Sequence, residues 1–245
     1  MQIITSTQNK RIKERAKLLK KKDRDKTGYF LVEGSHMIQE ALQAQVLDEL
    51  YVAEGSTLSI DFPQIVCTQP VINRLSHQQS DAKYIGVCHK VNHTKKDIKR
   101  VLLLDDVQDP GNVGTIFRTA YSFGYDKIFL SKHCADVYNP KTIQSTQGSL
   151  FHLDFAYVDL METIKNLQKQ NIRIFGSALH KDSQNLQDIV VPETFGIVLG
   201  HEGHGICDDI LNLCDQLVHI EMEQFESLNV AVAAAILCYE MRYNK

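Results

Sequence analysis

The chain has 245 residues, of which 43% are hydrophobic, so it can fill the core of one large domain or of two small ones. No apolar run approaches the about 18 residues of a membrane span, and the N-terminus lacks a signal-peptide core, so we expect a cytoplasmic protein with no membrane partner. Six scattered cysteines without a C-x-x-C pair give neither a disulfide framework nor a zinc signature, and the net charge of −3 by itself argues against nucleic acid.

The N-terminal segment is far more basic than the chain as a whole. Between Lys10 and Lys26 there are ten Lys or Arg residues and three Asp or Glu residues, so the rest of the chain is strongly acidic. The spacing of Ile12, Ala16 and Leu19 predicts one helix over residues 7–22, with lysines on the opposite face. We expect this basic end to contact a polyanion. A solvated helix face is the alternative interpretation.

The next segments predict a small α/β unit. A helix is expected over residues 35–44, and short strands are expected at 29–32, 50–52, 65–67 and 84–88. The polar and basic stretch VNHTKKDIKR at 91–100 predicts a domain boundary. We therefore divide the chain into a first domain at 1–95, a linker at 96–100 and a second domain at 101–245.

From residue 101 onward, strands alternate with helices. Strands are predicted at 101–104, 127–130, 155–158, 173–179, 195–200 and 217–220. Helices are predicted at 113–123, 141–147, 160–170 and 227–243. This alternation is typical of a parallel sheet with helices on both faces. Ligands on such sheets bind beyond the carboxyl ends of the strands, where three segments are rich in polar and glycine residues.

The first of these segments is DDVQDPGNVGTIFRTAYSFG at 105–124. Asn112 is predicted to cap the following helix. Arg118 follows six residues later, so we expect it to point from the first or second turn, where a guanidinium suits bidentate phosphate binding. The alternative is a simple cap and a surface ion pair.

The second segment is FGIVLGHEGHGI at 195–206, whose glycines at 200, 203 and 205 predict a tight loop close to a ligand. It matches neither G-x-G-x-x-G nor the phosphate-loop pattern, which disfavours a nucleotide triphosphatase and a nicotinamide-dependent oxidoreductase. His201, His204 and Cys207 suggest zinc, but H-E-G-H is one residue short of H-E-x-x-H, so we expect no metal.

The third segment is HIEMEQFESLNVAVAAAILCYE at 219–240. Ser227 is predicted to cap an alanine-rich helix. The N-terminus of that helix offers free amides and a partial positive charge, which suit a carboxylate or a phosphate. The alternative is a well-capped core helix with no ligand.

Taken together, the three segments resemble the SpoU (TrmH-like) branch of the SPOUT RNA methyltransferases. The match comprises N-x-G-x-x-x-R at Asn112, Gly114 and Arg118, then L-G-x-E-G-x-G at 199–205, then S-L-N at 227–229. DVYNPKTIQSTQGSLFHL at 136–153 also resembles the family. So do two N-terminal features, FLVEGSHMIQEAL at 30–42 and the pattern formed by Ser6, Asn9, Ile12, Lys13 and Leu18. The sequence departs from the family at 220–224, where IEMEQ replaces I-P-M-x-G.

The resemblance implies a fold, a reaction and partners. The fold is an α/β chain with a C-terminal parallel-sheet SPOUT domain containing a deep trefoil knot. A small N-terminal α/β domain of the ribosomal protein L30e type would bind the RNA substrate. The family is homodimeric, with the active site near the dimer interface. The expected reaction transfers a methyl group from S-adenosyl-L-methionine, without a metal, to a ribose 2′-hydroxyl, and we expect 23S-type ribosomal RNA as the substrate.

The resemblance also implies roles for individual residues. Arg118 is tied to activation of the hydroxyl. Asn112, Ser227 and Asn229 would position the substrate, and Glu202 would order the glycine loop or pair with an arginine across the dimer. The cofactor would be held by Leu199, Gly200, Ile220, Met222, Ser227 and Leu228. RNA would be bound by Asn9, Lys10, Arg11, Lys13 and Lys17 together with Arg118. Two alternatives stay open, namely the same reaction on transfer RNA and a non-catalytic RNA-binding protein with this fold.

Overall fold

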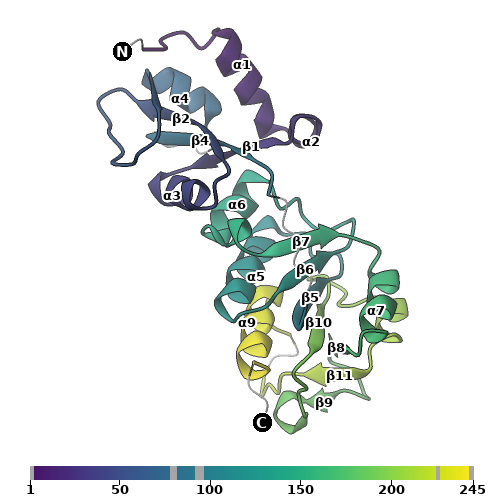
Figure 1. Ribbon diagram of the computed structural model, residues 1–245. Helices are drawn as coiled ribbons and strands as arrows, with labels where there is room; N and C mark the ends of the chain where they lie inside the picture. The colour runs from purple at the N-terminus through teal and green to yellow at the C-terminus, as the bar shows by residue number, and fades with distance from the viewer. Residues whose placement is uncertain (1–2, 78–81, 92–96, 225–226, 243–245) are drawn as a thin grey trace. The chain divides into compact units, whose positions relative to one another are not determined.

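The computed structural model describes residues 3–77, 82–91, 97–224 and 227–242 (Figure 1). They form two compact units, the first made of the chain up to residue 92 together with 136–152, and the second made of 93–135 and 153 onward. Among the described residues, no helix has the length and apolarity needed to cross a membrane. The linker predicted at 96–100 stays a prediction, and its first residue lies outside the described ranges.

A four-stranded sheet organises the first unit. Its order is β1-β4-β2-β3, with β4 antiparallel to both neighbours and β2 parallel to β3. The strands are β1 (Tyr29–Glu33), β2 (Leu47–Ala53), β3 (Gln64–Cys67) and β4 (Tyr84–His89). The helices are α1 (Lys10–Ala16), α2 (Lys21–Thr27), α3 (Ser35–Gln43), α4 (Gln69–Leu75) and α6 (Pro140–Thr146), with 3₁₀ turns η1 (Lys17–Leu19) and η2 (Ser149–Phe151). The predicted small α/β unit is confirmed, although α4 was not predicted.

The basic segment is not one helix, so that prediction is wrong. The helix α1 ends at Ala16, the η1 turn follows, and Lys20 has an extended backbone before α2 begins. A continuous helix would carry Leu18 away from the face of Ile12, because six residues correspond to about 240° of rotation after one full turn. The break instead lets both Leu18 and Ile12 enter the same core cluster.

A buried carboxylate holds α1 against the sheet. Glu49, on β2, is 8% exposed and accepts hydrogen bonds from Nε of Arg11 at 3.2 Å and from Nε and Nη2 of Arg15 at 3.0 and 2.7 Å. The hydroxyl of Tyr51 also donates to it. Burial alone would raise the pKa of Glu49, but the hydrogen bonds from Arg15, Arg11 and Tyr51 outweigh burial and lower the pKa to about 2.

A seven-stranded sheet organises the second unit. Its order is β7-β6-β5-β10-β8-β11-β9, and every recorded pairing is parallel. The strands are β5 (Arg100–Leu104), β6 (Lys127–Leu130), β7 (Asp154–Tyr157), β8 (Arg173–Ser177), β9 (Gln184–Asn185), β10 (Phe195–Leu199) and β11 (Gln216–His219). The helices are α5 (Pro110–Ser122), α7 (Leu160–Gln168), α8 (Asp208–Leu211) and α9 (Val230–Glu240), with a 3₁₀ turn η3 (Leu186–Asp188).

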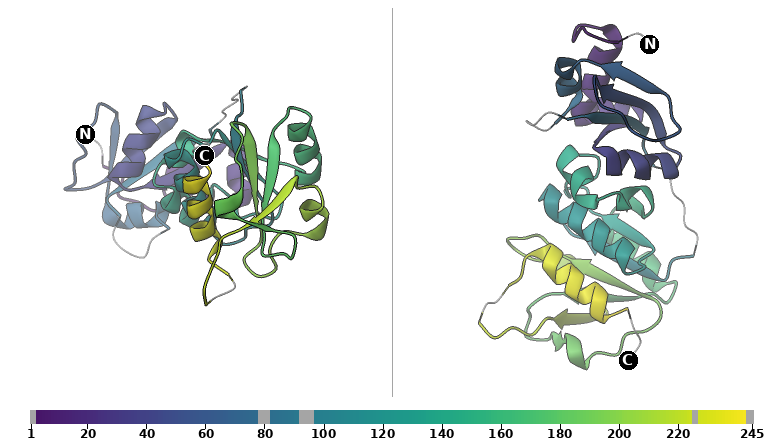
Figure 2. Two further views of the ribbon diagram at one scale, coloured as in Figure 1. Left: turned by 90° about the horizontal axis from the view of Figure 1, so that it is seen from below. Right: turned by 90° about the vertical axis from the view of Figure 1, so that its left-hand side faces the viewer.

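Helices cover both faces of this sheet, as predicted. The left view of Figure 2 shows α9 (yellow) on one side of the strands and α7 (green) on the other. Leu160, Ile164 and Leu167 of α7 form one core cluster with alternate residues of the strands, including Val101 and Leu103. Chain order reverses between β5 and β10, which creates the kind of switch point where ligands of parallel sheets bind.

We expect Glu49→Gln to lower the free energy of unfolding by about 2 kcal/mol, because the arginine donors lose a buried charged acceptor. The pKa of Glu49 is about 2 in the folded chain, below its ordinary 4.5, so its stabilising contribution is complete above pH 4.5 and is lost as the pH falls toward 2. Urea unfolding of the full chain between pH 7 and pH 2.5 measures both effects. Glu14→Gln, at an exposed position of α1, is the matched control. Equal effects of the two substitutions at pH 7 would contradict this account.

Candidate active site at the carboxyl edge of the parallel sheet

The carboxyl ends of four neighbouring strands lie together at one edge of the parallel sheet. The registers Leu104 with Leu199, Gly176 with Val198, and Ser177 with Val218 bring the ends of β5, β8, β10 and β11 to one edge. A cavity of about 480 Å³ opens there. Its walls come from four segments: 177–180 at the end of β8, the glycine loop 199–206, residues 219, 220 and 222 at the end of β11, and 227–230 at the start of α9. Asp208, Leu211 and Ala233 complete the lining.

All six residues expected to hold a cofactor line this cavity: Leu199, Gly200, Ile220, Met222, Ser227 and Leu228. Glu202 and Asn229 line it as well. Three further lining residues were not predicted from the sequence: Leu179 and His180 after β8, and His219 at the end of β11. The polar ends of β8 and β11 were the available signal. Those polar residues can be assigned to the cavity only once β8 and β11 are known to lie on the same side of β10.

The glycine loop folds back onto the end of its own strand. The backbone N–H groups of His201 and Gly205 each donate to the carbonyl of the other at 3.0 Å. A Cβ on Gly200 would lie 2.2 Å from the carbonyl carbon of Gly205 and 2.3 Å from the nitrogen of Ile206, so no side chain fits. Asp105, directly after β5, anchors the loop by accepting from the N–H of Cys207 at 2.9 Å.

Glu202 joins the glycine loop to the segment after β5. Its carboxylate accepts from Nδ2 of Asn112 at 3.0 Å and from the backbone N–H groups of Asp109 and Gln108 at 3.2 and 3.3 Å. Burial by itself raises the pKa of Glu202, but these hydrogen bonds outweigh it and the pKa is lowered. Glu202 is therefore ionised at neutral pH.

Asn112 extends this connection to the third loop. Its Oδ1 accepts from Nδ2 of Asn229 at 3.0 Å. The three motifs singled out in the sequence are thus joined by two side-chain hydrogen bonds, from Glu202 through Asn112 to Asn229. The side-chain oxygen Oδ1 of Asn229 accepts from the N–H groups of Ala231 and Val232 at the start of α9.

Both predicted helix caps are wrong. The helix α5 begins at Pro110, and its cap is Asp109, whose carboxylate accepts from the N–H of Asn112 at 2.9 Å. The helix α9 begins at Val230 and is capped by Asn229, not Ser227. In each case a neighbouring Asp or Asn takes the cap. The capping leaves Asn112 inside α5, where its amide reaches Glu202.

Arg118 lies in the third turn of α5, not in the first or second as predicted, because the helix begins at Pro110. Its side chain is exposed, does not line the cavity, and makes no hydrogen bond or ion pair to the described residues. Within one chain, the structure brings Asn112, Glu202, Ser227 and Asn229 together and leaves Arg118 outside the group.

The residues expected to bind RNA fall into two sets. Lys10, Lys13 and Lys17 are exposed. Asn9 caps α1 by accepting from the N–H of Arg11 at 2.9 Å, and the guanidinium of Arg11 is paired with Glu49. Hydrogen bonding to Glu49 raises the pKa of Arg11 further. Asn9 and Arg11 therefore have structural partners that the sequence pattern did not indicate.

The histidines beside the cavity do not form a metal centre. His201 and His204 stack with ring centroids 4.0 Å apart, and Nδ1 of His219 lies 2.9 Å from the hydroxyl of Ser183. No group of three or more His, Cys, Asp or Glu side chains suited to a metal occurs among the described residues.

The loop that departs from the expected I-P-M-x-G pattern is tied to a neighbouring turn. The carboxylate of Glu221 accepts from Nδ2 of Asn185 at 2.9 Å. Asn185 in turn caps η3 by accepting from the N–H of Gln187. A side-chain hydrogen bond thus restrains the loop at the position where proline was expected, and Met222 still lines the cavity.

Comparison with known proteins matches the chain over both units. The sequence model of the SpoU rRNA Methylase family matches residues 99–239, and that of the MRM3-like substrate binding domain matches residues 9–86. The chain is 35% identical to the 23S rRNA (guanosine(2553)-2′-O)-methyltransferase RlmP of Bacillus subtilis, across 99% of this chain and 100% of that protein.

Two solved structures match the fold over nearly the full length. A crystal structure of an RNA 2′-O ribose methyltransferase aligns with a TM-score of 0.85 and 28% identity, covering 98% of each chain. The SpoU methyltransferase AviRb from Streptomyces viridochromogenes, in complex with the cofactor AdoMet, aligns with a TM-score of 0.83 and 25% identity, covering 96% of this chain and 97% of that one.

We expect Gly200→Ala to lower the free energy of unfolding by about 1–3 kcal/mol, because its Cβ collides with backbone that has no room to move. Gly203→Ala is the matched control, since its Cβ would meet the His201 ring at 3.4 Å, an ordinary contact. Denaturant unfolding of the two variants beside the unmodified chain measures the difference. A Gly200→Ala variant as stable as Gly203→Ala would show that the loop is not packed in this way.

Proposed function

Because the chain belongs to the SpoU rRNA methylase family, we propose that it transfers a methyl group from S-adenosyl-L-methionine to a ribose 2′-hydroxyl of ribosomal RNA, of the 23S type. The observation that carries this proposal is that two of the motifs line one cavity and that Asn112 of the first motif is hydrogen-bonded to both, through Glu202 and Asn229. The match to RlmP over the full length of both proteins favours ribosomal RNA over transfer RNA as the substrate.

The cavity suits the proposed cofactor. Its volume of about 480 Å³ is within the range of small-molecule sites, and apolar side chains of Leu199, Ile206 and Val230 line it beside strand ends. The cofactor-bound structure of AviRb, with the same fold, supports this assignment. Leu199, Gly200, Ile220, Met222 and Leu228 would hold the adenosine part. When bound, S-adenosyl-L-methionine supplies a methyl group on a sulfonium that leaves as a neutral thioether.

The main task of the protein in this reaction is to align the attacking hydroxyl with the methyl group, which is worth up to about 7–11 kcal/mol. Asn112, Ser227 and Asn229 would orient the ribose by neutral hydrogen bonds. The ionised carboxylate of Glu202 fixes the amide of Asn112 and so determines which of its atoms the substrate meets. A change at Glu202 would therefore act through Asn112.

Arg118 would activate the ribose hydroxyl. A guanidinium is almost never neutral in a protein, so Arg118 is not expected to act as a proton acceptor. We therefore assign Arg118 a clamp on the target phosphate, with its charge lowering the pKa of the hydroxyl and the proton passing to phosphate or water. Its bidentate geometry suits this role better than a lysine would.

The exposed position of Arg118 supports a homodimer in which it serves the cavity of the partner. The helices α5 and α9 pack against each other. They also expose large apolar side chains, with Tyr121 at 49%, Val232 at 48% and Tyr239 at 51%. Such exposed apolar side chains are typical of surfaces that a second copy covers. A dimer formed there would bring Arg118 to a neighbouring cavity.

Further parts of the proposal follow from family membership. We extend to this chain the deep trefoil knot in the C-terminal domain and the cytoplasmic location. We also propose that the exposed Lys10, Lys13 and Lys17 grip RNA phosphates, a contact that weakens steeply as salt rises. The SpoU family has an RNA substrate, and only RNA carries the 2′-hydroxyl.

Labelled methyl transfer to ribosomal RNA and to DNA of matched sequence tests the reaction. We expect transfer to the RNA alone, and equal labelling of both would refute the ribose target. Arg118→Lys should lower turnover by about a hundredfold, because the charge stays but the bidentate geometry is lost. Arg173→Lys, at the amino end of β8, is the matched control and should leave turnover unchanged. Near-normal turnover of Arg118→Lys would contradict the assigned role.

A mixture of two inactive variants tests whether Arg118 acts across the dimer. Arg118→Ala keeps the cavity, whereas Gly200→Ala disrupts the cavity and keeps the arginine. Co-expression should restore about a quarter of normal activity, because half of randomly formed dimers are mixed and each contains one complete site. No recovery, with mixed dimers verified by differently tagged copies, would indicate that Arg118 acts within its own chain.

A further inference from the structure

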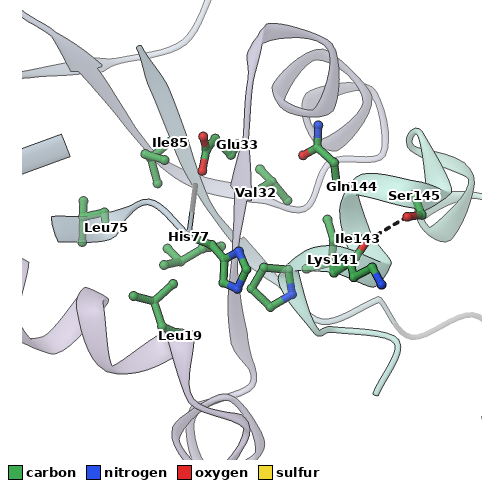
Figure 3. A pocket seen from close by; sticks show the side chains of 12 residues that line it. Leu19, Val32, Glu33, Leu75, His77, Ile85, Lys141, Ile143, Gln144 and Ser145 are labelled. Atoms are coloured by element: carbon green, nitrogen blue, oxygen red, sulfur yellow. Dashed lines mark hydrogen bonds between the residues drawn. The ribbon is translucent and has the colours of Figure 1, made fainter. Parts of the chain in front are cut away.

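The first unit contains a second cavity, of about 270 Å³, which shares no lining residue with the first (Figure 3). One wall comes from the sheet and its flanking segments, with Leu31, Val32 and Glu33 of β1, Ile85 of β4, and His77 just after α4. The opposite wall comes from α6, with Lys141, Ile143 and Gln144 (Figure 3). All of these residues belong to the same compact unit.

The size of the cavity suits one planar ring system. Sites for complete small-molecule ligands usually measure about 300–1,000 Å³, and this one lies just below that range. Leu31, Val32, Ile85 and Ile143 in its walls are buried apolar side chains. A single nucleobase offers two flat apolar faces to such walls and keeps its polar groups on its edge.

The polar groups of the cavity are few and differ in character. Glu33 accepts a hydrogen bond from the hydroxyl of Ser76 through Oε2 at 2.8 Å. Its Oε1 has no donor among the described residues. A carboxylate only accepts, so a ligand beside Glu33 must present donors. The His77 ring and the side chains of Lys141 and Gln144 lie along the rest of the cavity (Figure 3).

We propose that this cavity binds an unstacked guanine base of the RNA substrate, an inference that rests on the proposed function. Among the four RNA bases, guanine alone presents two adjacent donors, N1–H and the 2-amino group, on its Watson–Crick edge, and together they match a carboxylate. The Gln144 amide carries a donor for the guanine carbonyl oxygen. The His77 ring supplies a stacking face of the kind that RNA-binding sites use.

Exposed lysines beside one lining residue of the cavity support a ligand with a phosphate backbone. Leu19, which lines it, lies between the exposed Lys17 and Lys20. An apolar slot for a base beside cations for its phosphates is the usual arrangement for single-stranded nucleic acid. An apolar metabolite would fit the walls but would leave the Glu33 carboxylate desolvated without a donor, which is unfavourable.

Binding of the full chain to uridine octamers that carry one central guanosine, inosine or adenosine tests the proposal. Inosine lacks only the 2-amino group, so it removes one donor to Glu33. We expect the guanosine octamer to bind about tenfold more tightly than the inosine octamer, since a hydrogen bond to a charged group is lost. Fluorescence anisotropy at one fixed salt concentration measures this ratio without any change to the protein.

The variant Glu33→Gln should reduce that guanosine-to-inosine ratio to near one, because its amide presents donors where the carboxylate only accepted. Glu14→Gln, which removes an exposed carboxylate outside the cavity, should keep the ratio. Equal affinity of the unmodified chain for all three octamers would overturn the proposal, and so would a preference that persists in Glu33→Gln.

These measurements use no cofactor, so they are separate from the proposed reaction. A chain that prefers guanosine but methylates no RNA would refute the proposed function and keep the base site. A chain that methylates ribosomal RNA without any preference among the octamers would refute the base site and keep the proposed function. Calorimetric titration of each variant with S-adenosyl-L-methionine checks that the second unit is intact, because the two cavities share no residue.

Discussion

The ionised carboxylate of Glu202 determines how the side-chain amides of Asn112 and Asn229 are oriented beside the candidate active site. Because a carboxylate only accepts hydrogen bonds, the Nδ2 atom of Asn112 must face it, and Oδ1 must face away. That oxygen in turn requires a donor, which Nδ2 of Asn229 supplies, so the side-chain oxygen Oδ1 of Asn229 faces the backbone N–H groups at the start of α9. One carboxylate thus fixes the orientation of two side-chain amides, and the second of these caps α9.

The conformation of the same loop is also restricted sterically at Gly200, where no side chain fits. The fold-back at His201 and Gly205 brings backbone to within 2.5 Å of any side chain at position 200. Glu202 follows directly, so its carboxylate is presented toward the segment after β5 by a turn that has little freedom. The N-terminal unit contains a comparable arrangement. The buried carboxylate of Glu49 on β2 accepts hydrogen bonds from arginines of α1 and from Tyr51, and so holds α1 against the sheet.

Apolar runs bounded by polar residues located most strands of both sheets within a few residues, because burial on both faces leaves a plain signal in the chain. Helix starts were predicted less well. Asp109 and Asn229 cap the two helices in place of Asn112 and Ser227, and the amide of Asn112 instead donates to Glu202, which is distant in sequence. The break after Ala16 depends on where Leu18 is buried. The cavity wall after β8 depends on strand order, which local periodicity does not encode.

Residues 136–152 belong to the first compact unit although the chain on either side of them belongs to the second. The polypeptide therefore passes between the two units three times, and severing it near residue 92 would not yield a whole N-terminal module. Phe30 would lose the rings of Tyr138 and Phe151, and Arg24 would lose the carboxylate of Asp136. A simple end-to-end fusion that replaced only the chain up to residue 92 would sever these contacts, so 136–152 would have to be exchanged together with it.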